Sequence, residues 1–238
     1  NAHNLLTVEV PLPPEKYSDV QRSAFFTSFL GAVRSLPGVT SAAAISQLPL
    51  RDPFNDISIY AADDPPTDPT KMGDGYQRVV LPGYFQTMGI PILAGRDIEP
   101  ADTAHSRRVV VISQQLAKAL FPTRNPLGQM VVIDRAQDAP WQIAGVVGDV
   151  KQSRLRDDAR FRGTFYRSHA QLPLPTMRLA IRTAGSPAAI VRTLGELLRK
   201  MDPDIPLSGP RTMEEVMANG AVSETAQAAC LAAFSMLA

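Results

Sequence analysis

A strand–helix–strand pattern occurs twice in this chain, once near each end, and this repetition limits the folds open to it. In the first copy, alternating apolar residues over Leu5–Val10 predict a strand. Ser18 and Gln21 form a capping box that starts an amphipathic helix of about five turns, with Val20 at the start of its apolar stripe. The Leu-Pro-Gly sequence at 36–38 ends this helix, because proline disfavours helix in the preceding residue and glycine accepts the left-handed conformation. A second strand is predicted over 39–48.

The second copy has the same order. A strand is predicted over 177–182, followed by a helix with Ser186 as its cap and Pro187 at its first position. The Asp-Pro pair at 202–203 ends this helix, and another strand begins at 205–207. Because a lone β-α-β unit buries only one face of its helix, we expect the two copies to pair sheet to sheet, with the middle of the chain inserted between them.

The inserted segment has the composition of a turn-rich β unit. Its β-branched runs, separated by proline and glycine, predict strands over 57–60, 76–81, 109–112, 130–133 and 141–147. Two short helices are expected, over 82–88 and, capped by Ser113, over 114–120. The arginine-rich segment 151–171 is predicted to be a loop with a short strand near Phe165. After the second strand–helix–strand copy, Thr212 and Glu215 form another capping box, which predicts a further helix. The fold class predicted for the whole chain is α+β.

Composition excludes several classes of protein. The 238 residues include 24 basic and 23 acidic side chains, a net charge of +1, which argues against a nucleic-acid binder. Cys230 is the single cysteine, so the chain can form neither an internal disulfide nor a cysteine-based metal site. His3, His105 and His169 are too far apart for a spacing such as HxxxH, and a site assembled from them in three dimensions is the minor alternative.

No sequence motif points to bond chemistry. The glycine-rich run from Gly145 through Gly148 to Asp149 follows a predicted strand, but it has neither the GxxxxGK[ST] nor the GxGxxG spacing of a phosphate-binding loop. A strand-to-loop bend is the favoured interpretation. No GxSxG, HExxH, CxxC or EF-hand sequence is present. We therefore expect no catalytic, cofactor-binding or metal-binding residues.

Two charged clusters and one aromatic cluster allow a functional interpretation beside a structural one. The acidic cluster could bind calcium but lacks regular spacing, and the basic cluster could meet lipid phosphates or an acidic partner; a solvated loop is favoured for both. Phe25 could face a partner subunit, although a place in the core is favoured for it. The acidic cluster is Asp63, Asp64, Asp68 and Asp74. The basic cluster is Lys151, Arg154, Arg156, Arg160, Arg162 and Arg167, and the aromatic cluster is Phe25, Phe26 and Phe29.

The two ends suggest a segment of a longer protein. Asn1 is not an initiator methionine, and no signal peptide precedes it. Residues 226–238 form an uncharged run that is too short to cross a bilayer alone, since a spanning helix needs about 20 apolar residues. This run is interpreted either as the first turns of a membrane helix or as a buried C-terminal helix.

Three phrases in the middle of the chain carry a family resemblance: PGYFQTMGIPILAGRDI, RVVVISQQLAKALFPTRNPLGQMV and IAGVVGDVKQSRLRD. With the later MRLAIRTAGSPAAIVRTLGELLRKMDPDIPL, their order resembles the extracytoplasmic core domain of ABC-transporter permeases of the MacB/FtsX type. The resemblance covers nearly the whole chain. It implies a porter-like pair of β-α-β repeats, residues 1–50 plus 172–238, and an inserted β-rich, sabre-like subdomain, residues 51–171.

The resemblance also implies a function without catalysis. Such domains lie outside the cytoplasmic membrane, in the periplasm or extracellular space, between the first and second transmembrane helices of the permease. They transmit ATP-driven motion to a cargo protein or a periplasmic adaptor, in export, efflux or lipoprotein release. ATP is hydrolysed by a separate or fused cytoplasmic ATPase, and the parent permease is expected to be dimeric. An extracytoplasmic ligand-binding or sensory domain is the alternative function, and an enzyme with a site assembled from scattered polar residues is a further one.

Overall fold

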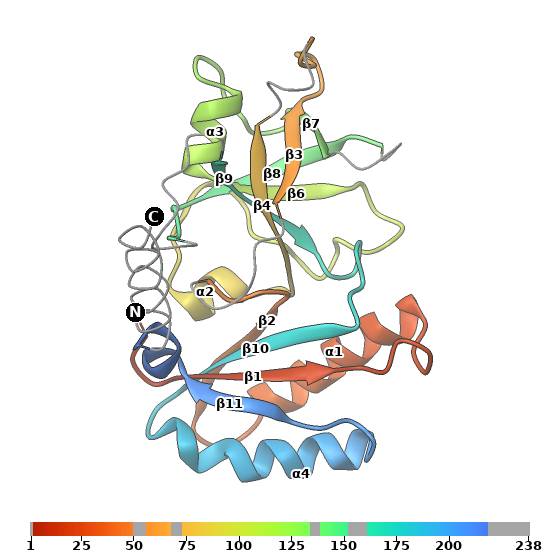
Figure 1. Ribbon diagram of the computed structural model, residues 1–238, viewed down its shortest axis with the longest axis vertical. Helices are drawn as coiled ribbons and strands as arrows, with labels where there is room; N and C mark the ends of the chain where they lie inside the picture. Colours follow the sequence, from red (N-terminus) through yellow and green to blue (C-terminus); the bar gives the residue numbers. More distant parts are fainter. Residues whose placement is uncertain (1, 50–55, 68–72, 134–138, 152–160, 219–238) are drawn as a thin grey trace, which may run out of the picture.

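The computed structural model describes residues 2–49, 56–67, 73–133, 139–151 and 161–218, and the side chains of all of these except 161 and 162. The chain forms two parts, one above the other in Figure 1. The labelled elements of the lower part, which we call the base, are four strands, two α-helices and a short 3-10 helix. These are β1 (Leu5–Pro11), α1 (Asp19–Arg34), β2 (Val39–Ile45), β10 (Thr176–Thr183), η2 (Pro187–Ile190), α4 (Val191–Met201) and β11 (Ser208–Thr212).

The base is one antiparallel sheet in the order β11-β1-β10-β2. β10 therefore lies between the two strands of the first β-α-β unit, and β1 lies between the two strands of the second. The prediction that the units pair sheet to sheet is wrong, because they interleave edge to edge. Interleaving gives the two central strands hydrogen-bond partners on both sides and leaves one face of the sheet for both helices.

The core of the base lies between this face and the helices. Buried residues of α1 and α4 meet alternate residues of β1 and β10 there, among them Val8, Val10, Phe26, Phe29, Leu179 and Leu194. Phe25 is also buried, and its ring lies edge-on against Tyr17 and Phe26, which confirms its place in the core. Val20, predicted to belong to the stripe, is 78% exposed in the first turn of α1.

The predicted helix signals are partly confirmed. Ser18 and Gln21 form the expected capping box, and so do Thr212 and Glu215, after which residues up to 218 are helical. Ser186, in contrast, makes no side-chain capping bond, because the chain first turns through η2 before α4 begins. The strand predicted from 205 starts later, at Ser208.

The upper part is a closed barrel. Its strands pair in the order β4-β3-β7-β8-β6-β9, and β9 returns to β4, so that the ring has no open edge. β5 pairs with β8 outside this ring, and α2 and α3 are the short helices of this part. The bounds are β3 (Asp56–Ala61), β4 (Asp74–Val80), α2 (Tyr84–Met88), β5 (Ile92–Gly95), β6 (Val109–Ser113), α3 (Gln114–Leu120), β7 (Met130–Ile133), β8 (Trp141–Val147) and β9 (Phe161–Ser168).

The barrel has its own apolar core, which includes Ile59, Ile112, Val131, Trp141 and Phe165. The strand predicted near Phe165 is present but longer than expected, since β9 is an eight-residue strand between β4 and β6; residues 152–160 of the predicted loop lie outside the described residues. Arg167 in this strand suggested a solvent-exposed segment. The Arg167 guanidinium is buried 3.9 Å from the centre of the Trp141 ring, and its Nη1 donates to Gln77.

Within the described ranges, no helix combines the length and the apolar character that crossing a bilayer requires. The run 226–238 and Cys230 lie outside these ranges.

Candidate functional site

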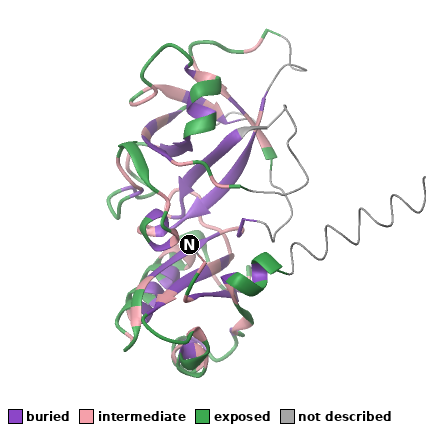
Figure 2. Cartoon of the chain, turned by 90° about the vertical axis from the view of Figure 1, so that its left-hand side faces the viewer, coloured by how far each residue is buried: buried purple, intermediate pink, exposed green. Residues whose placement is uncertain are grey.

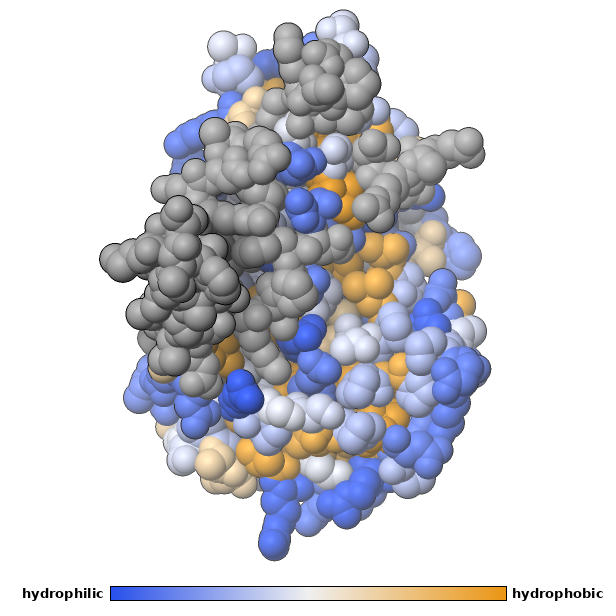
Figure 3. Space-filling view, in the orientation of Figure 1, coloured by the Kyte–Doolittle hydropathy of each residue, from blue (hydrophilic) through white to orange (hydrophobic). Residues whose placement is uncertain are grey.

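The junction between base and barrel is a packed core. One strand pair, Ile45 with Val80, joins β2 to β4 across it, and below the barrel Tyr84 and Phe85 of α2 pack against Tyr166 of β9 and against Ala43 and Ile45. Figure 2 shows buried residues running without a break from one part into the other. On the face shown in Figure 3, apolar side chains lie in separate patches on both parts. The two parts are therefore joined by side-chain packing as well as by the chain.

Two arginines of the base hold the segment around α2. Arg34, the last residue of α1, donates from Nε to the carbonyl oxygen of Ala42 (2.8 Å) and from Nη2 to that of Pro82 (2.7 Å). Arg182 of β10 donates from Nε and Nη2 to the carbonyl oxygen of Thr87 (3.1 and 2.9 Å) and from Nη1 to that of His3 (2.9 Å). A cation at the last turn of α2 also complements the partial negative charge there.

A third arginine ties β10 to the point where the chain leaves the base. Arg178 forms an ion pair with Glu9 (2.8 Å) and donates to the carbonyl oxygen of Ser46 (2.6 Å). The Ser46 hydroxyl accepts the backbone N–H of Val79 in β4 (3.0 Å). This chain of contacts runs from β1 through β10 into the barrel strand that reaches the junction.

The loop 96–107 covers one side of the junction and is organised by Asp102. Arg96 donates to both carboxylate oxygens of Asp102 (2.8 Å each), and the backbone N–H of Glu99 donates to Oδ2. Burial acts to raise the pKa of Asp102, but the hydrogen bonds from Arg96 and from the Glu99 N–H outweigh it, so that the pKa is lowered. Gln171 accepts from Val109 N–H and donates to the carbonyl oxygens of the loop, which fixes the loop to the segment after β9.

His169 lies buried where that segment returns to the base. Its ring meets Phe26 edge-on at 5.2 Å, and its Nε2 lies 3.1 Å from the backbone nitrogen and oxygen of Leu174. Among the described residues, its Nδ1 has no hydrogen-bond partner. Burial lowers the pKa of His169, so the neutral imidazole is favoured.

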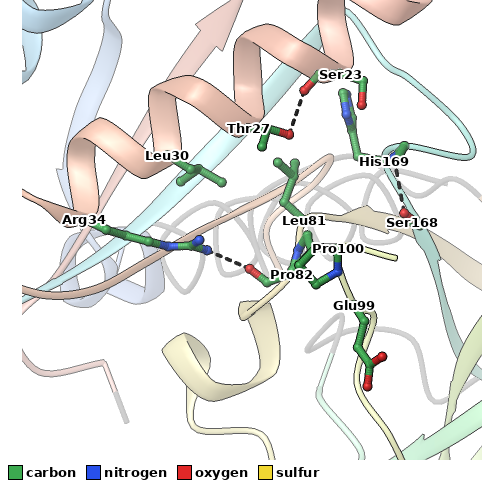
Figure 4. A pocket seen from close by; sticks show the side chains of 11 residues that line it. Ser23, Thr27, Leu30, Arg34, Leu81, Pro82, Glu99, Pro100, Ser168 and His169 are labelled. Atoms are coloured by element: carbon green, nitrogen blue, oxygen red, sulfur yellow. Dashed lines mark hydrogen bonds between the residues drawn. The ribbon is translucent and has the colours of Figure 1, made fainter. Parts of the chain in front are cut away.

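A groove of about 140 Å³ separates α1 from the junction (Figure 4). Its helix side is formed by Ser23, Thr27, Leu30 and Arg34, and its other side by Leu81, Pro82, Glu99, Pro100, Ser168, His169 and Ala170. This volume is below the roughly 300–1,000 Å³ of a pocket for a drug-sized ligand.

The structure separates the residues of the acidic cluster. Asp63 pairs with Arg124, whose hydrogen bond lowers the pKa of Asp63, and Asp74 lies in β4 and accepts from the Ser58 hydroxyl (2.9 Å). Asp64 is exposed, and Asp68 lies outside the described residues. In the part of the chain that is described, no three His, Cys, Asp or Glu side chains come close enough to hold a metal ion.

The other candidates are equally dispersed. His3 is exposed beside Glu214 (3.4 Å), His105 is exposed and His169 is buried. Of the basic cluster, Lys151 is exposed and Arg167 is inside the barrel, while Arg154, Arg156, Arg160 and the side chain of Arg162 lie outside the described set.

The glycine-rich run ends β8 and holds α3. A Cβ at Gly145 would collide with the backbone of Arg96, so this glycine permits the close approach of the segment after β5. Asp149 accepts the backbone N–H of Gln115 in the first turn of α3 (2.8 Å). These contacts give a structural reason for Gly145 and Asp149.

Sequence reasoning missed the residues that join the two parts. Arg34, Arg182 and Asp102 carried no motif. Arg34 and Arg182 bond to backbone carbonyls far away in the sequence, whereas Asp102 bonds to Arg96 and the Glu99 N–H within its own loop. Their positions at the end of an element or in a short polar loop were the only signal.

The arrangement of base and barrel is shared with solved structures of transport proteins. The periplasmic region of MacB from Actinobacillus actinomycetemcomitans superposes with a TM-score of 0.56 at 16% identity, covering 87% of this chain and 89% of that one. The extracellular domain of the noncanonic ABC-type transporter YknZ from Gram-positive bacteria gives 0.53 at 15% identity, covering 85% and 100%. A domain of a putative permease from Porphyromonas gingivalis gives 0.55 at 12% identity, covering 89% and 92%. The fold is thus that of an extracytoplasmic transporter domain.

The sequence gives the family. Residues 3–197 match the model of the MacB-like periplasmic core domain, and the chain belongs to this family, the periplasmic domains of MacB/FtsX-like ABC-transporter permeases. A relative is the macrolide export ATP-binding/permease protein MacB of Aggregatibacter actinomycetemcomitans, which is 35% identical over 66 residues. That match takes in 28% of this chain and 10% of the relative, so the chain spans a small part of that protein's length.

Proposed function

We propose that this domain lies between the first and second transmembrane helices of its parent permease and transmits ATP-driven motion to a cargo or adaptor protein. The base, residues 1–50 plus 172–238, is the lever, and the inserted part, residues 51–171, is the head that meets the partner. Family membership supports an ABC permease as the parent, with ATP hydrolysed by a cytoplasmic ATPase partner. In this proposal no residue of the domain performs bond chemistry.

The observation that carries the proposal is the path of contacts from the first strand to the head. His3 and Glu214 lie 3.4 Å apart, and β1 pairs with β11, so the two outer parts of the chain are neighbours in the base. Arg182 bonds to the carbonyl oxygens of His3 and Thr87. A displacement of β1 therefore acts directly on α2, beneath the barrel.

The test uses the full-length permease, reconstituted with its ATPase in lipid and with Cys230 replaced by serine. Spin labels at Asn125→Cys in the head or at Arg199→Cys in the base report distances between the two subunits of the expected dimer. We expect nucleotide binding to change both distances. In Arg182→Gln, the base distance still changes, whereas the head distance becomes broad and insensitive to nucleotide.

Arg192→Gln is the matched control, since this exposed arginine of α4 lies away from α2. It should behave as wild type. The proposal is wrong if nucleotide moves neither label, or if the head responds fully in Arg182→Gln.

A further inference from the structure

The groove beside α1 has the features of a binding site. Ser23, Thr27, Leu30 and Arg34 are spaced by four, three and four residues, so they lie on one stripe of the helix, over about 16 Å of its length. Figure 4 shows this stripe facing Leu81 and the two prolines of the junction. The groove is therefore bounded by two rigid elements, and Arg34 marks one end of it.

Arg34 is an exposed residue whose guanidinium is partly withdrawn from water at the groove and forms no ion pair with a described residue. Its Nε and Nη2 donate to backbone carbonyls, which are neutral, and its Nη1 makes no hydrogen bond with any described residue. No carboxylate within the described ranges forms an ion pair with it. Burial alone lowers the pKa of Arg34, with no negative neighbour to offset the cost of desolvation. A guanidinium in this state favours an anionic partner, and its planar fork matches a carboxylate.

Glu99 does not supply that anion. It belongs to the groove lining, but Figure 4 shows its carboxylate directed away from α1. Its nearest cation is Arg96, at 3.9 Å. An anion that pairs with Arg34 in this groove would therefore come from outside the described part of the chain.

The walls and the volume limit what this anion can be. Leu30, Leu81, Pro82 and Pro100 make the groove mainly apolar beside the guanidinium. The volume of about 140 Å³ is small for a ligand site and suits a ligand of a few heavy atoms. A cation at one end and apolar side chains beside it match a carboxylate on a short branched hydrocarbon.

We infer that this groove binds a small organic monocarboxylate, with the carboxylate on Arg34 and the apolar body between Leu30 and Leu81. The ligand would contact α1 of the base and the 81–82 segment at the junction together. This inference concerns binding alone and does not rest on the transport role proposed above.

The experiment titrates the 238-residue chain with isovalerate and follows backbone amide shifts by NMR. Isovaleramide, of the same shape but neutral, is the matched probe. We expect isovalerate to bind with a Kd of roughly 1 mM, to shift the amides of residues lining the groove, and to bind at least tenfold more tightly than the amide.

Two variants locate the site. Arg34→Gln should weaken isovalerate binding at least tenfold, although it also removes the bonds to Ala42 and Pro82. Thr27→Trp leaves Arg34 in place and fills the groove, so it should abolish binding. Ser28→Trp, at the neighbouring exposed position outside the groove, should bind as wild type.

Three results would overturn the inference. One is the absence of saturable shifts with isovalerate. Another is equal binding of acid and amide, which would leave Arg34 without a role. The third is unchanged binding in Thr27→Trp while its amide spectrum shows a folded protein.

Discussion

At the scale of single residues, backbone geometry and burial decide what each position tolerates. Gly95 has a φ of +72°, and a Cβ there would collide with the carbonyl oxygen of Ala144 in the neighbouring strand. Gly89 has nearly the same φ, +71°, but open space around it. Substitutions at these two positions can therefore be compared to separate the free-energy cost of the left-handed conformation from that of a close backbone approach.

Gly95→Ala should destabilise the domain by about 3 kcal/mol or more, since the strain of roughly 1–2 kcal/mol from the left-handed conformation is joined by a backbone collision. Gly89→Ala should cost only the conformational strain. Urea unfolding followed by the fluorescence of Trp141, buried in the barrel, measures both. Equal losses in the two variants would show that β5 moves away from β8 without cost.

His169 should make stability depend on pH. Its pKa in the folded protein is lowered by burial first and by Arg22, while the Leu174 backbone and Asp19 act to raise it. The unfolded chain therefore binds a proton at a higher pH, near 6.5, so the stability from neutral His169 is present above that pH and is lost as pH falls below it.

His169→Gln should accordingly show a weaker loss of unfolding free energy between about pH 7 and 5 than wild type, the difference being at most about 1.4 kcal/mol per pH unit. Urea unfolding at several pH values checks this. Exposed His105→Gln is the control and should keep the wild-type slope.

At the scale of elements, the sequence predicted the position of a helix or strand correctly where the residues that define it lie within that element. The capping boxes at Ser18 and Thr212 and the unbroken apolar run of β6 were predicted correctly, because their evidence lies within a few residues. β9 was predicted only as a short strand near Phe165, since its arginines suggest solvent until Trp141, from another strand, is known to face Arg167. β5 was missed because its four residues are exposed and lack an alternating pattern.

The loop 96–107 has no regular secondary structure, and its order should depend on Asp102. Asp102→Ala removes the two bonds from Arg96 and the bond from Glu99 N–H, and we expect a loss of roughly 2 kcal/mol, as for charged hydrogen bonds. Asp63→Ala breaks an exposed pair with Arg124 and should change stability little. Urea unfolding compares them, and a similar effect of both changes would contradict the special role of Asp102.

At the scale of the whole molecule, the repetition of β-α-β units predicted the base, but the order of its strands could not be predicted. Two β-α-β units can stack or interleave with the same local sequence, and only the packing of both helices on one face decides between these arrangements. The candidate site was out of reach for a similar reason. Arg34, the segment from Pro82 to Thr87, and Arg182 are three separate parts of the sequence that meet only in the folded chain.

Because the junction is a shared core, base and barrel should unfold together. Trp141 reports on the barrel, whereas far-UV circular dichroism includes the signal of α1 and α4, the longest described helices, both in the base. In wild type the two urea transitions should coincide. In Arg182→Gln they should separate, and in Arg192→Gln they should not. Separate transitions in wild type would mean that the contacts across the junction do not couple the two parts.

The closed ring of the upper part limits how this domain can pair with strands of other chains. Open strand edges invite pairing with other chains, and the ring has none, while β5 outside it has only four residues. In the base, the outermost strand β11 contains Pro210, which offers no N–H to an incoming strand. Neither the ring nor β11 therefore offers an incoming strand a full row of backbone partners.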